Sequence, residues 1–271
     1  MFGSFSGAGK VVSIVGAGSP GNMGQIMARR FAEAGAKVVV SGRRTDVLAD
    51  LASSIDGDWV ACDFCDRASI GHMVTEVQKR HGSIDVAINA TGWGLLNGFC
   101  ETSEDELDRM VDLQFKGPFI WLQRLVEVMS VQGQGCIIQI SSATAKIMLD
   151  DHAAYMGTKA GIDHVIRTVA NEFGTKGIRA NTISPGLTDT PMTADALQSP
   201  ALAKAFSQCY PMGRYGTSDD IAAAALFLAS EDCSMTGENL QVNGGLCLRR
   251  NPRAHELEEA MIAAGEIPAP E

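Results

Sequence analysis

Short runs of apolar and often β-branched residues recur along the chain, and stretches with helical spacing separate them. The pattern predicts strands at residues 10–15, 37–41, 58–62, 84–89, 135–141, 178–184 and 239–243. Several of these runs are apolar without interruption, which is typical of strands that helices cover on both sheet faces. The intervening pattern predicts helices near residues 23–34, 45–54, 66–80, 103–130, 152–174 and 218–230.

This regular alternation of strand and helix indicates an α/β protein. Parallel strands joined by right-handed crossovers form a doubly wound sheet, here of about seven strands with helices on both faces. No linker, repeat or low-complexity run divides the chain between residues 1 and 245, so we expect one domain there. Within it, residues 187–213 form a long connection with helical pieces, and long connections of this kind often close over a site as lids.

Residues 246–271 depart from the alternation and form a C-terminal extension. Asn251 is the expected N-cap of a helix, with Pro252 at its first position and Gly265 as its stop. Leu257, Met261 and Ala264 fall on one apolar stripe of that helix. The stripe predicts that the helix docks, either on a neighbouring subunit, where it helps to enclose a pocket, or on the edge of its own sheet.

Composition narrows the classes of partner. The chain has 271 residues, 45% hydrophobic and 20% charged, which suits a globular protein with a sizeable core. A net charge of -10 argues against nucleic acid or an anionic membrane surface as a partner. The N-terminal stretch lacks the pattern of a signal peptide, and no apolar run is long enough for a spanning helix.

The seven cysteines are scattered, which suits a reducing compartment and predicts a cytoplasmic protein. Cys62 and Cys65 match C-x-x-C, a spacing found in zinc sites. His72 and His81 are near in sequence, but they do not complete a ligand set at the required spacing. The alternative is an ordinary strand end, which we favour, and we predict no metal site.

A glycine-rich turn follows the first predicted strand and opens the first helix, in the stretch VSIVGAGSPGNMGQ. Glycine lets the backbone approach a pyrophosphate, and the N–H groups of a helix N-terminus bind it. A plain tight turn would also contain glycine, but the strand–turn–helix context favours a dinucleotide site.

The end of the second strand bears on the choice of dinucleotide. A carboxylate there would bind the ribose 2′-hydroxyl of NAD, whereas an arginine accepts the 2′-phosphate of NADP. Arg43 and Arg44 occupy this place, and the first acid is Asp46. Both arginines are alternatively plain surface charge, but the pattern favours NADP over NAD.

Tyr155 stands four residues before Lys159 in a predicted helix, so the two side chains share one face. Two residues of this kind also occur on ordinary solvated helix faces. Lowering the pKa of a tyrosine from about 10 to about 7 takes roughly 4 kcal/mol. An adjacent ammonium group and the charge of an oxidised nicotinamide would act in that direction.

With these motifs the chain resembles the short-chain dehydrogenase/reductase family, over about residues 10–245 and in the family's order. Ser142 stands thirteen residues before Tyr155, as the catalytic serine of that family does. The stretches ACDFCD, NATG, SPGLTDTPM and GENLQVNGG resemble the family's other motifs. The resemblance implies a Rossmann-type fold, a carbonyl or secondary alcohol substrate, and a homodimer or homotetramer.

The resemblance assigns residues to a cofactor site and a substrate site. It implies that the cofactor site is formed by Gly16, Gly18, Ser19, Asn22, Met23, Gly24, Arg43, Arg44, Asp63, Phe64, Asn89, Ala90, Thr91, Gly92, Tyr155, Lys159, Pro185, Gly186, Thr188 and Thr190. The neighbours of these motifs predict a substrate pocket of Trp93, Leu95, Thr144, Leu149, His152, Met156 and Met192. These are largely apolar, which favours an apolar or aromatic substrate. His152 is alternatively an ordinary structural histidine.

Three departures from the family pattern concern the site. The turn from Gly16 to Gly24 is two residues longer than usual, so Asn22 and Met23 stand where a glycine is common. Ala90 replaces a usual asparagine. Gln114 stands where the family has the asparagine of its catalytic tetrad, which holds a water in the proton relay through a local kink of its helix.

The resemblance implies roles for the catalytic residues. Tyr155 is the general acid in reduction and the base in oxidation, Lys159 lowers its pKa and holds the nicotinamide ribose, and Ser142 binds the substrate oxygen. Gln114 is a further catalytic candidate. Two alternatives stay open: an enoyl reductase of related fold, which the Y-x-x-x-K spacing disfavours, and a dinucleotide-binding regulator that has lost catalysis.

Overall fold

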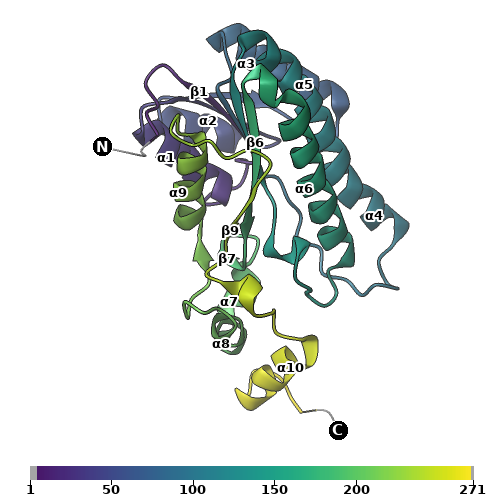
Figure 1. The fold of residues 1–271 in the computed structure, drawn as a ribbon. Coiled ribbons are helices and arrows are strands. Elements are labelled where there is room, and N and C mark those ends of the chain that lie inside the picture. Colours follow the sequence, from purple (N-terminus) through teal and green to yellow (C-terminus); the bar gives the residue numbers. More distant parts are fainter. Residues whose placement is uncertain (1–4, 270–271) are drawn as a thin grey trace.

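The computed structural model describes residues 5–269, which form one central sheet with helices on both faces (Figure 1). Seven parallel strands lie in the order β3-β2-β1-β4-β5-β6-β9. They are β1 Val11–Val15, β2 Lys37–Gly42, β3 Asp58–Ala61, β4 Val86–Asn89, β5 Gly135–Ile140, β6 Ile178–Pro185 and β9 Asn239–Val242. The prediction of a doubly wound sheet of about seven strands is therefore confirmed.

Two hydrophobic clusters, one on each face of the sheet, hold the helices. The first cluster carries α1 Met23–Glu33, α2 Thr45–Ser54 and α9 Ser218–Ala229, and the second carries α3 Arg67–His81, α5 Gly117–Gln132 and α6 Ala153–Phe173. Successive side chains of a strand point to opposite faces, so Val12 and Ile14 enter the first cluster and Val11 and Val15 the second. Both faces of the central strands are thus covered, as their unbroken apolar runs predicted.

The sheet has its topological switch point beside β1. The chain first adds β2 and β3 on one side of β1, then crosses to add β4, β5 and β6 on the other. The connections that leave β1 and β4 therefore diverge, and a crevice opens beyond the carboxyl ends of these two strands. This is where the glycine turn and the stretch after Asn89 lie.

The helix predicted over residues 103–130 is interrupted. It consists of α4 Glu104–Val111, a π-helical turn Asp112–Lys116, and α5. Gln114 lies at the centre of the wide turn, where the resemblance implied a local kink. The regular α-helix resumes at Gly117, the first residue of α5. Gly117 packs so closely that a Cβ there would lie 2.1 Å from the Phe64 carbonyl oxygen.

The long connection contains helical pieces, as predicted: α7 Ala194–Gln198 and α8 Pro200–Gln208. A short parallel pair, β7 Thr188–Asp189 and β8 Gly216–Thr217, closes the two ends of this segment. This segment lies at the same end of the sheet as the crevice, near the C-terminal extension (Figure 1). Within residues 5–269, no helix has both the length and the hydropathy needed to cross a bilayer.

The helix of the C-terminal extension begins later than predicted. It is α10 Ala254–Ala263, and Arg253 is its N-cap residue. Asn251 cannot cap it, because its side-chain amide is buried and donates a hydrogen bond to the Met148 carbonyl at 3.0 Å. The predicted stop is confirmed, since Gly265 follows the helix with a φ of 73°. The helix packs against α8 of its own chain.

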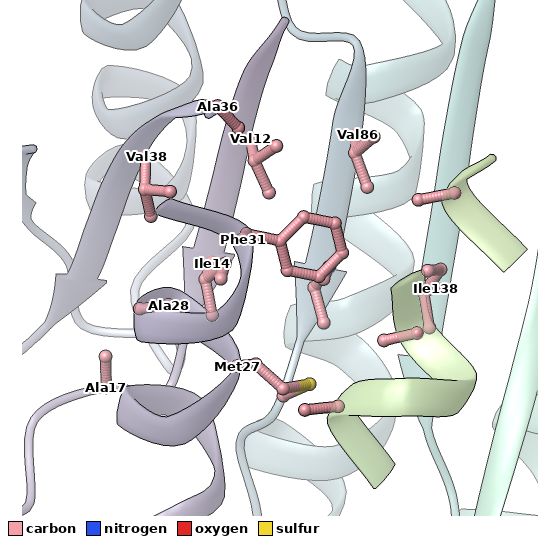
Figure 2. Close-up of a cluster of buried hydrophobic side chains, with 14 of the residues drawn as sticks. Val12, Ile14, Ala17, Met27, Ala28, Phe31, Ala36, Val38, Val86 and Ile138 are labelled. Atoms are coloured by element: carbon pink, nitrogen blue, oxygen red, sulfur yellow. The ribbon is translucent and has the colours of Figure 1, made fainter. Parts of the chain in front are cut away.

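Phe31 provides a test of the first cluster. Its ring is fully buried, and Figure 2 shows it in the cluster with Val12, Ile14 and Val86 of the sheet. We expect Phe31→Ala to lower the free energy of unfolding by about 3–5 kcal/mol, because the substitution leaves a cavity between α1 and the sheet. Urea unfolding followed by circular dichroism measures this. Phe119→Ala, at a site that is 42% exposed, should cost much less, and equal costs would contradict the proposed packing.

Candidate active site

A cavity of about 550 Å³ lies beyond the carboxyl ends of β1 and β4. Most of the predicted site residues meet on its wall. They are Gly16, Gly18, Ser19, Asn22, Met23, Arg43, Arg44, Asp63, Phe64, Ala90, Thr91, Gly92, Trp93, Ser142, Tyr155, Lys159, Pro185, Gly186, Thr188, Thr190 and Met192. The fold therefore brings the glycine turn, the two arginines and the Tyr155 helix to one cavity.

The glycine turn passes between two other backbone segments without room for side chains. Gly16 has a φ of 98°, and a Cβ there would lie 2.6 Å from the Ala90 carbonyl carbon. A Cβ at Gly24 would lie 2.6 Å from the Gly16 carbonyl oxygen. Both positions thus require glycine, and Gly24 supports the turn from behind the cavity wall. The turn opens directly into the N-terminus of α1, whose free N–H groups suit an anion.

The longer turn is held by hydrogen bonds of the Asn22 and Gln25 side chains. Asn22 is the N-cap of α1: its side-chain oxygen accepts from the Gln25 N–H, and its amide donates to the Gly16 carbonyl at 2.7 Å. The Gln25 side chain donates to the Ala17 carbonyl and accepts from the Gly21 N–H. Sequence reasoning missed Gln25, although a buried polar residue in the first turn of a helix was an available signal.

Arg43 and Arg44 flank the glycine turn at the end of β2. A Cβ at Gly18 would lie 3.7 Å from the Arg43 nitrogen, so the two segments nearly touch. Both arginines line the cavity and are exposed. Within residues 5–269 neither guanidinium has a carboxylate partner, as expected of cations that are free to bind a ligand.

The ends of β3 and β4 form the next part of the wall. Phe64 borders the cavity, and its buried ring packs edge-on against Trp121 in the core. Asn89 is fully buried and does not line the cavity. Its oxygen accepts from the N–H and the hydroxyl of Thr91, at 2.9 and 2.8 Å, and so fixes the turn that carries Thr91 and Gly92.

Ser142, Tyr155 and Lys159 meet at the other end of the cavity. Ser142 follows β5, and its hydroxyl lies 2.9 Å from the Thr144 hydroxyl. Tyr155 lies in the first turn of α6. The Lys159 ammonium, one turn later and 2% exposed, lies 5.4 Å from the centre of the Tyr155 ring. It donates a hydrogen bond to the Ile140 carbonyl at 2.9 Å.

Burial dominates the electrostatics of these groups. It raises the pKa of Tyr155 to about 12, against the effect of the hydrogen bond with Ser142. It lowers the pKa of Lys159 to about 8, against the effect of Asp163. In the protein without cofactor, burial outweighs the effect of the Ser142 hydrogen bond on this pKa. That Lys159 and an oxidised nicotinamide together lower the tyrosine pKa stays a prediction. At neutral pH the phenol is protonated and ready to donate.

Gln114 lies behind the cavity wall and is 2% exposed. Its amide donates to the Thr158 hydroxyl at 3.2 Å, and Thr158 in turn donates to the Tyr155 carbonyl. Its side-chain oxygen is buried without a partner, close to Gly92. Gln114 thus supports the turn of α6 that carries Tyr155, and no hydrogen bond joins it to Lys159.

Only two of the predicted substrate residues line the cavity, Trp93 and Met192. Met192 reaches from the lid to the stretch after β4, where it lies against Gly92 and Gly94. The predicted residues that do not line it are Leu95, Thr144, Leu149, His152 and Met156. Thr144 instead holds Ser142. Being close to Tyr155 or Ser142 in the sequence therefore did not determine which side chains line the cavity.

His152 is a structural partner of Tyr155. Its ring stacks on the phenol with centroids 4.2 Å apart, and Nδ1 donates to the Leu95 carbonyl at 2.7 Å. Burial lowers the pKa of His152, so the imidazole is neutral at neutral pH. The ring thus contacts the tyrosine and the loop after β4, and the predicted contact of His152 with substrate stays a prediction.

The lid side of the cavity is set by a residue that sequence reasoning missed. Tyr210 is buried, and its hydroxyl accepts a hydrogen bond from the Leu187 N–H at 2.6 Å. A Cβ at Gly186 would collide with that hydroxyl, so glycine is required in the turn after β6. Thr188 and Thr190 are oriented by bonds to Gly186 and Thr193. Further lining residues that were not predicted include Arg109 and Leu113.

The C-x-x-C pair shows no arrangement for a metal. Cys62 is buried at the end of β3, Cys65 is exposed, and both are free thiols. Among residues 5–269, no group of three or more His, Cys, Asp or Glu side chains is placed to hold a metal ion.

Comparison with known proteins assigns the family. A family model described as enoyl-(acyl carrier protein) reductase matches residues 16–247. The D-threitol dehydrogenase of Mycolicibacterium smegmatis is 32% identical over 247 residues, which cover 89% of this chain and 94% of the relative. The chain belongs to the short-chain dehydrogenase/reductase family.

Solved structures of the short-chain dehydrogenase/reductase family match the fold as well. One is a gluconate 5-dehydrogenase from Burkholderia cenocepacia in complex with NADP and tartrate, with a TM-score of 0.84, 28% identity, and coverage of 88% of this chain and 95% of that one. Another is a 3-ketoacyl-(acyl-carrier-protein) reductase from Brucella melitensis complexed with NADH, with a TM-score of 0.83, 29% identity and coverage of 89% and 99%. The protein is thus a short-chain dehydrogenase/reductase and an oxidoreductase, and such structures carry either nicotinamide cofactor.

The pKa of Lys159 predicts how reduction depends on pH. Because that pKa lies near 8, raising the pH through 8 removes the lysine charge, while Tyr155, with a pKa near 12, keeps its proton. We expect kcat/KM for carbonyl reduction to be level from pH 6.5 to about 8 and to fall above it. Asp163 and the neutral His152 are the titratable neighbours of the lysine. In Lys159→Arg the fall should move beyond pH 10, and an unmoved fall would contradict the assignment to Lys159.

Proposed function

We propose that this short-chain dehydrogenase/reductase transfers a hydride between NADP(H) and a carbonyl compound or secondary alcohol. The observation that carries the proposal is the meeting of Ser142, Tyr155 and Lys159 with the glycine turn in one cavity. A phenol, a hydroxyl and a buried ammonium are the groups needed to move a proton to or from a substrate oxygen. A site that only binds a nucleotide does not require these three groups together.

The cavity fits a dinucleotide at several points. The backbone of Gly16 and Gly24 is bare, and the turn ends at a helix N-terminus, as a pyrophosphate requires. Two unpaired guanidinium groups, from Arg43 and Arg44, border this turn, and no acid precedes them at the end of β2. A carboxylate there would repel a 2′-phosphate, so the charge pattern favours NADP over NAD.

Each catalytic group has a physical role in this proposal. When bound, the nicotinamide supplies or accepts the hydride. Tyr155 donates its proton to the substrate oxygen in reduction, since burial keeps the phenol protonated at neutral pH. Lys159 places a positive charge near the phenol ring, and this charge stabilises the negative charge that develops on the tyrosine oxygen as the proton leaves. Ser142, held by Thr144, donates to the same substrate oxygen.

The substrate side favours an apolar or aromatic compound. Trp93, Leu113 and Met192 line the cavity, and the methionine adapts to different shapes. A polyol or sugar acid is the second candidate, because D-threitol dehydrogenase and gluconate 5-dehydrogenase are among the similar proteins. The lid role of residues 187–213 belongs to the same proposal, since Met192 crosses from this segment to Gly92 and Gly94.

Other readings are weaker. The description of the matched family model would indicate an enoyl reductase. The Tyr155–Lys159 spacing and the similarity to dehydrogenases and a 3-oxoacyl reductase favour carbonyl chemistry instead. A regulator without catalysis has only Gln114 and Ala90 in its favour.

Gln114 acts, in our proposal, by supporting Tyr155 through Thr158. A proton relay that passes through the π-helical turn around Gln114 is the alternative. We further propose a cytoplasmic homo-oligomer, a dimer or tetramer.

The cofactor assignment is tested by titrating the protein with NADPH and NADH and following nicotinamide fluorescence. We expect NADPH to bind at least tenfold more tightly, a difference of about 1.4 kcal/mol. The double variant Arg43→Ala and Arg44→Ala should lose this preference, and NADH binding should stay within about twofold. Arg167→Ala, an exposed arginine on α6, is the matched control. Unchanged preference in the double variant would mean that these arginines do not select the cofactor.

The catalytic assignment is tested with Tyr155→Phe, which removes only the hydroxyl. Turnover of a ketone panel that spans aromatic, aliphatic and polyhydroxylated members should fall by at least about 10³-fold, whereas the Kd for NADPH should change by less than about threefold. Activity confined to the polyhydroxylated ketones would reject the apolar substrate and favour the second candidate. Cofactor binding without turnover of any substrate by the unmodified protein would support the regulator.

A further inference from the structure

The C-terminal extension contacts the turn that precedes the Tyr155 helix. The buried Asn251 side chain donates to the Met148 carbonyl at 3.0 Å. The Asp150 carboxylate then accepts from the Ala254 N–H at 3.0 Å and from the Arg253 guanidinium at 3.2 Å. These bonds join segments more than a hundred residues apart in the sequence, and they lie outside the alternating strand–helix pattern.

The far end of the same extension contacts the lid. Ser199 is the N-cap of α8, and it donates a hydrogen bond to the Glu266 carboxylate. The other oxygen of Glu266 accepts from the Ala201 N–H at 3.1 Å. A carboxylate at a helix N-terminus is favourable for the helix dipole. Glu266 of the extension therefore binds the first turn of α8, and α10 packs against the same helix.

The two contacted segments both continue into the candidate site. Asp151 has a φ of 57°, a backbone form that a side chain disfavours, so its surroundings must hold it. Its carbonyl accepts from the Asn97 N–H at 2.7 Å. The next residue, His152, stacks on the Tyr155 ring. On the other flank, α8 follows α7 and the stretch with Met192, whose side chain lies against Gly92 and Gly94.

We infer that the C-terminal extension is a positioning element of the active site. By holding Asp150 through Arg253 and the start of α8 through Glu266, it fixes the distance between the turn that carries Tyr155 and the lid on the substrate side. Among residues 5–269, no hydrogen bond or ion pair joins the extension to the glycine turn or to Arg43 and Arg44, so we expect its effect on the substrate and on Tyr155 rather than on the cofactor. The kinetic part of this inference rests on the proposed function, whereas the structural part does not.

The test uses the full chain with Asn251→Leu, Arg253→Met and Glu266→Met combined. These changes remove the side-chain bonds from the extension to both segments and leave only the bond from the Ala254 N–H to Asp150. Glu258→Gln, at an exposed position on the same helix, is the matched control. Hydrogen exchange is measured over residues 148–155 and 199–208. NADPH binding and the kcat and KM for a small and a bulky ketone are measured in parallel.

We expect exchange in both segments to rise by at least tenfold, and kcat/KM for the ketones to fall by at least tenfold, with NADPH binding within twofold and the control unchanged. Unchanged exchange in the two segments would overturn the inference. So would faster exchange with unaltered kcat and KM, or faster exchange throughout the chain with weaker NADPH binding, because each indicates a merely structural extension. If the unmodified protein reduces no ketone, the proposed function fails, and exchange at residues 152–155 alone decides whether the extension holds the tyrosine.

Discussion

Three backbone segments meet at Gly16 without room for a side chain, and the rest of the site depends on this close approach. A Cβ at Gly16 would overlap the Ala90 carbonyl, and one at Gly24 would overlap the Gly16 carbonyl. The contact joins the turn after β1 to the stretch after β4, at the point where the sheet order reverses. In the proposed function, this bare backbone is where the pyrophosphate of the dinucleotide would approach.

The polar groups at the other end are governed by desolvation. Lys159 is almost fully buried, yet its ammonium is held by the Ile140 carbonyl at the end of β5. Burial lowers the pKa of the lysine and raises that of the tyrosine, so the two groups stand closer to their neutral forms than in water. The raised pKa keeps the phenol protonated at neutral pH but also makes it a weaker acid than free tyrosine. In the proposed reaction, the charges of Lys159 and of an oxidised nicotinamide would lower this pKa again.

Parts of the molecule beyond the family's motifs also hold the site. Gln25 stabilises the longer glycine turn, Tyr210 fixes the turn after β6, and His152 stacks on the catalytic tyrosine. Tyr210 and His152 also bind backbone groups that are distant along the chain, the Leu187 N–H and the Leu95 carbonyl. The glycine turn is held instead by bonds within its own stretch.

The sequence by itself determined the strands, the doubly wound sheet, the glycine turn and the Ser142, Tyr155 and Lys159 group, because strand and helix periodicities and short motifs are local properties. The sequence predicted the wrong start for α10, because the Asn251 side chain binds the Met148 carbonyl instead of capping the helix. It also did not show that Thr144 and His152 contact Ser142 and Tyr155 and do not line the cavity. Only the tertiary structure decided these points, because burial and hydrogen bonding depend on which distant segments come together.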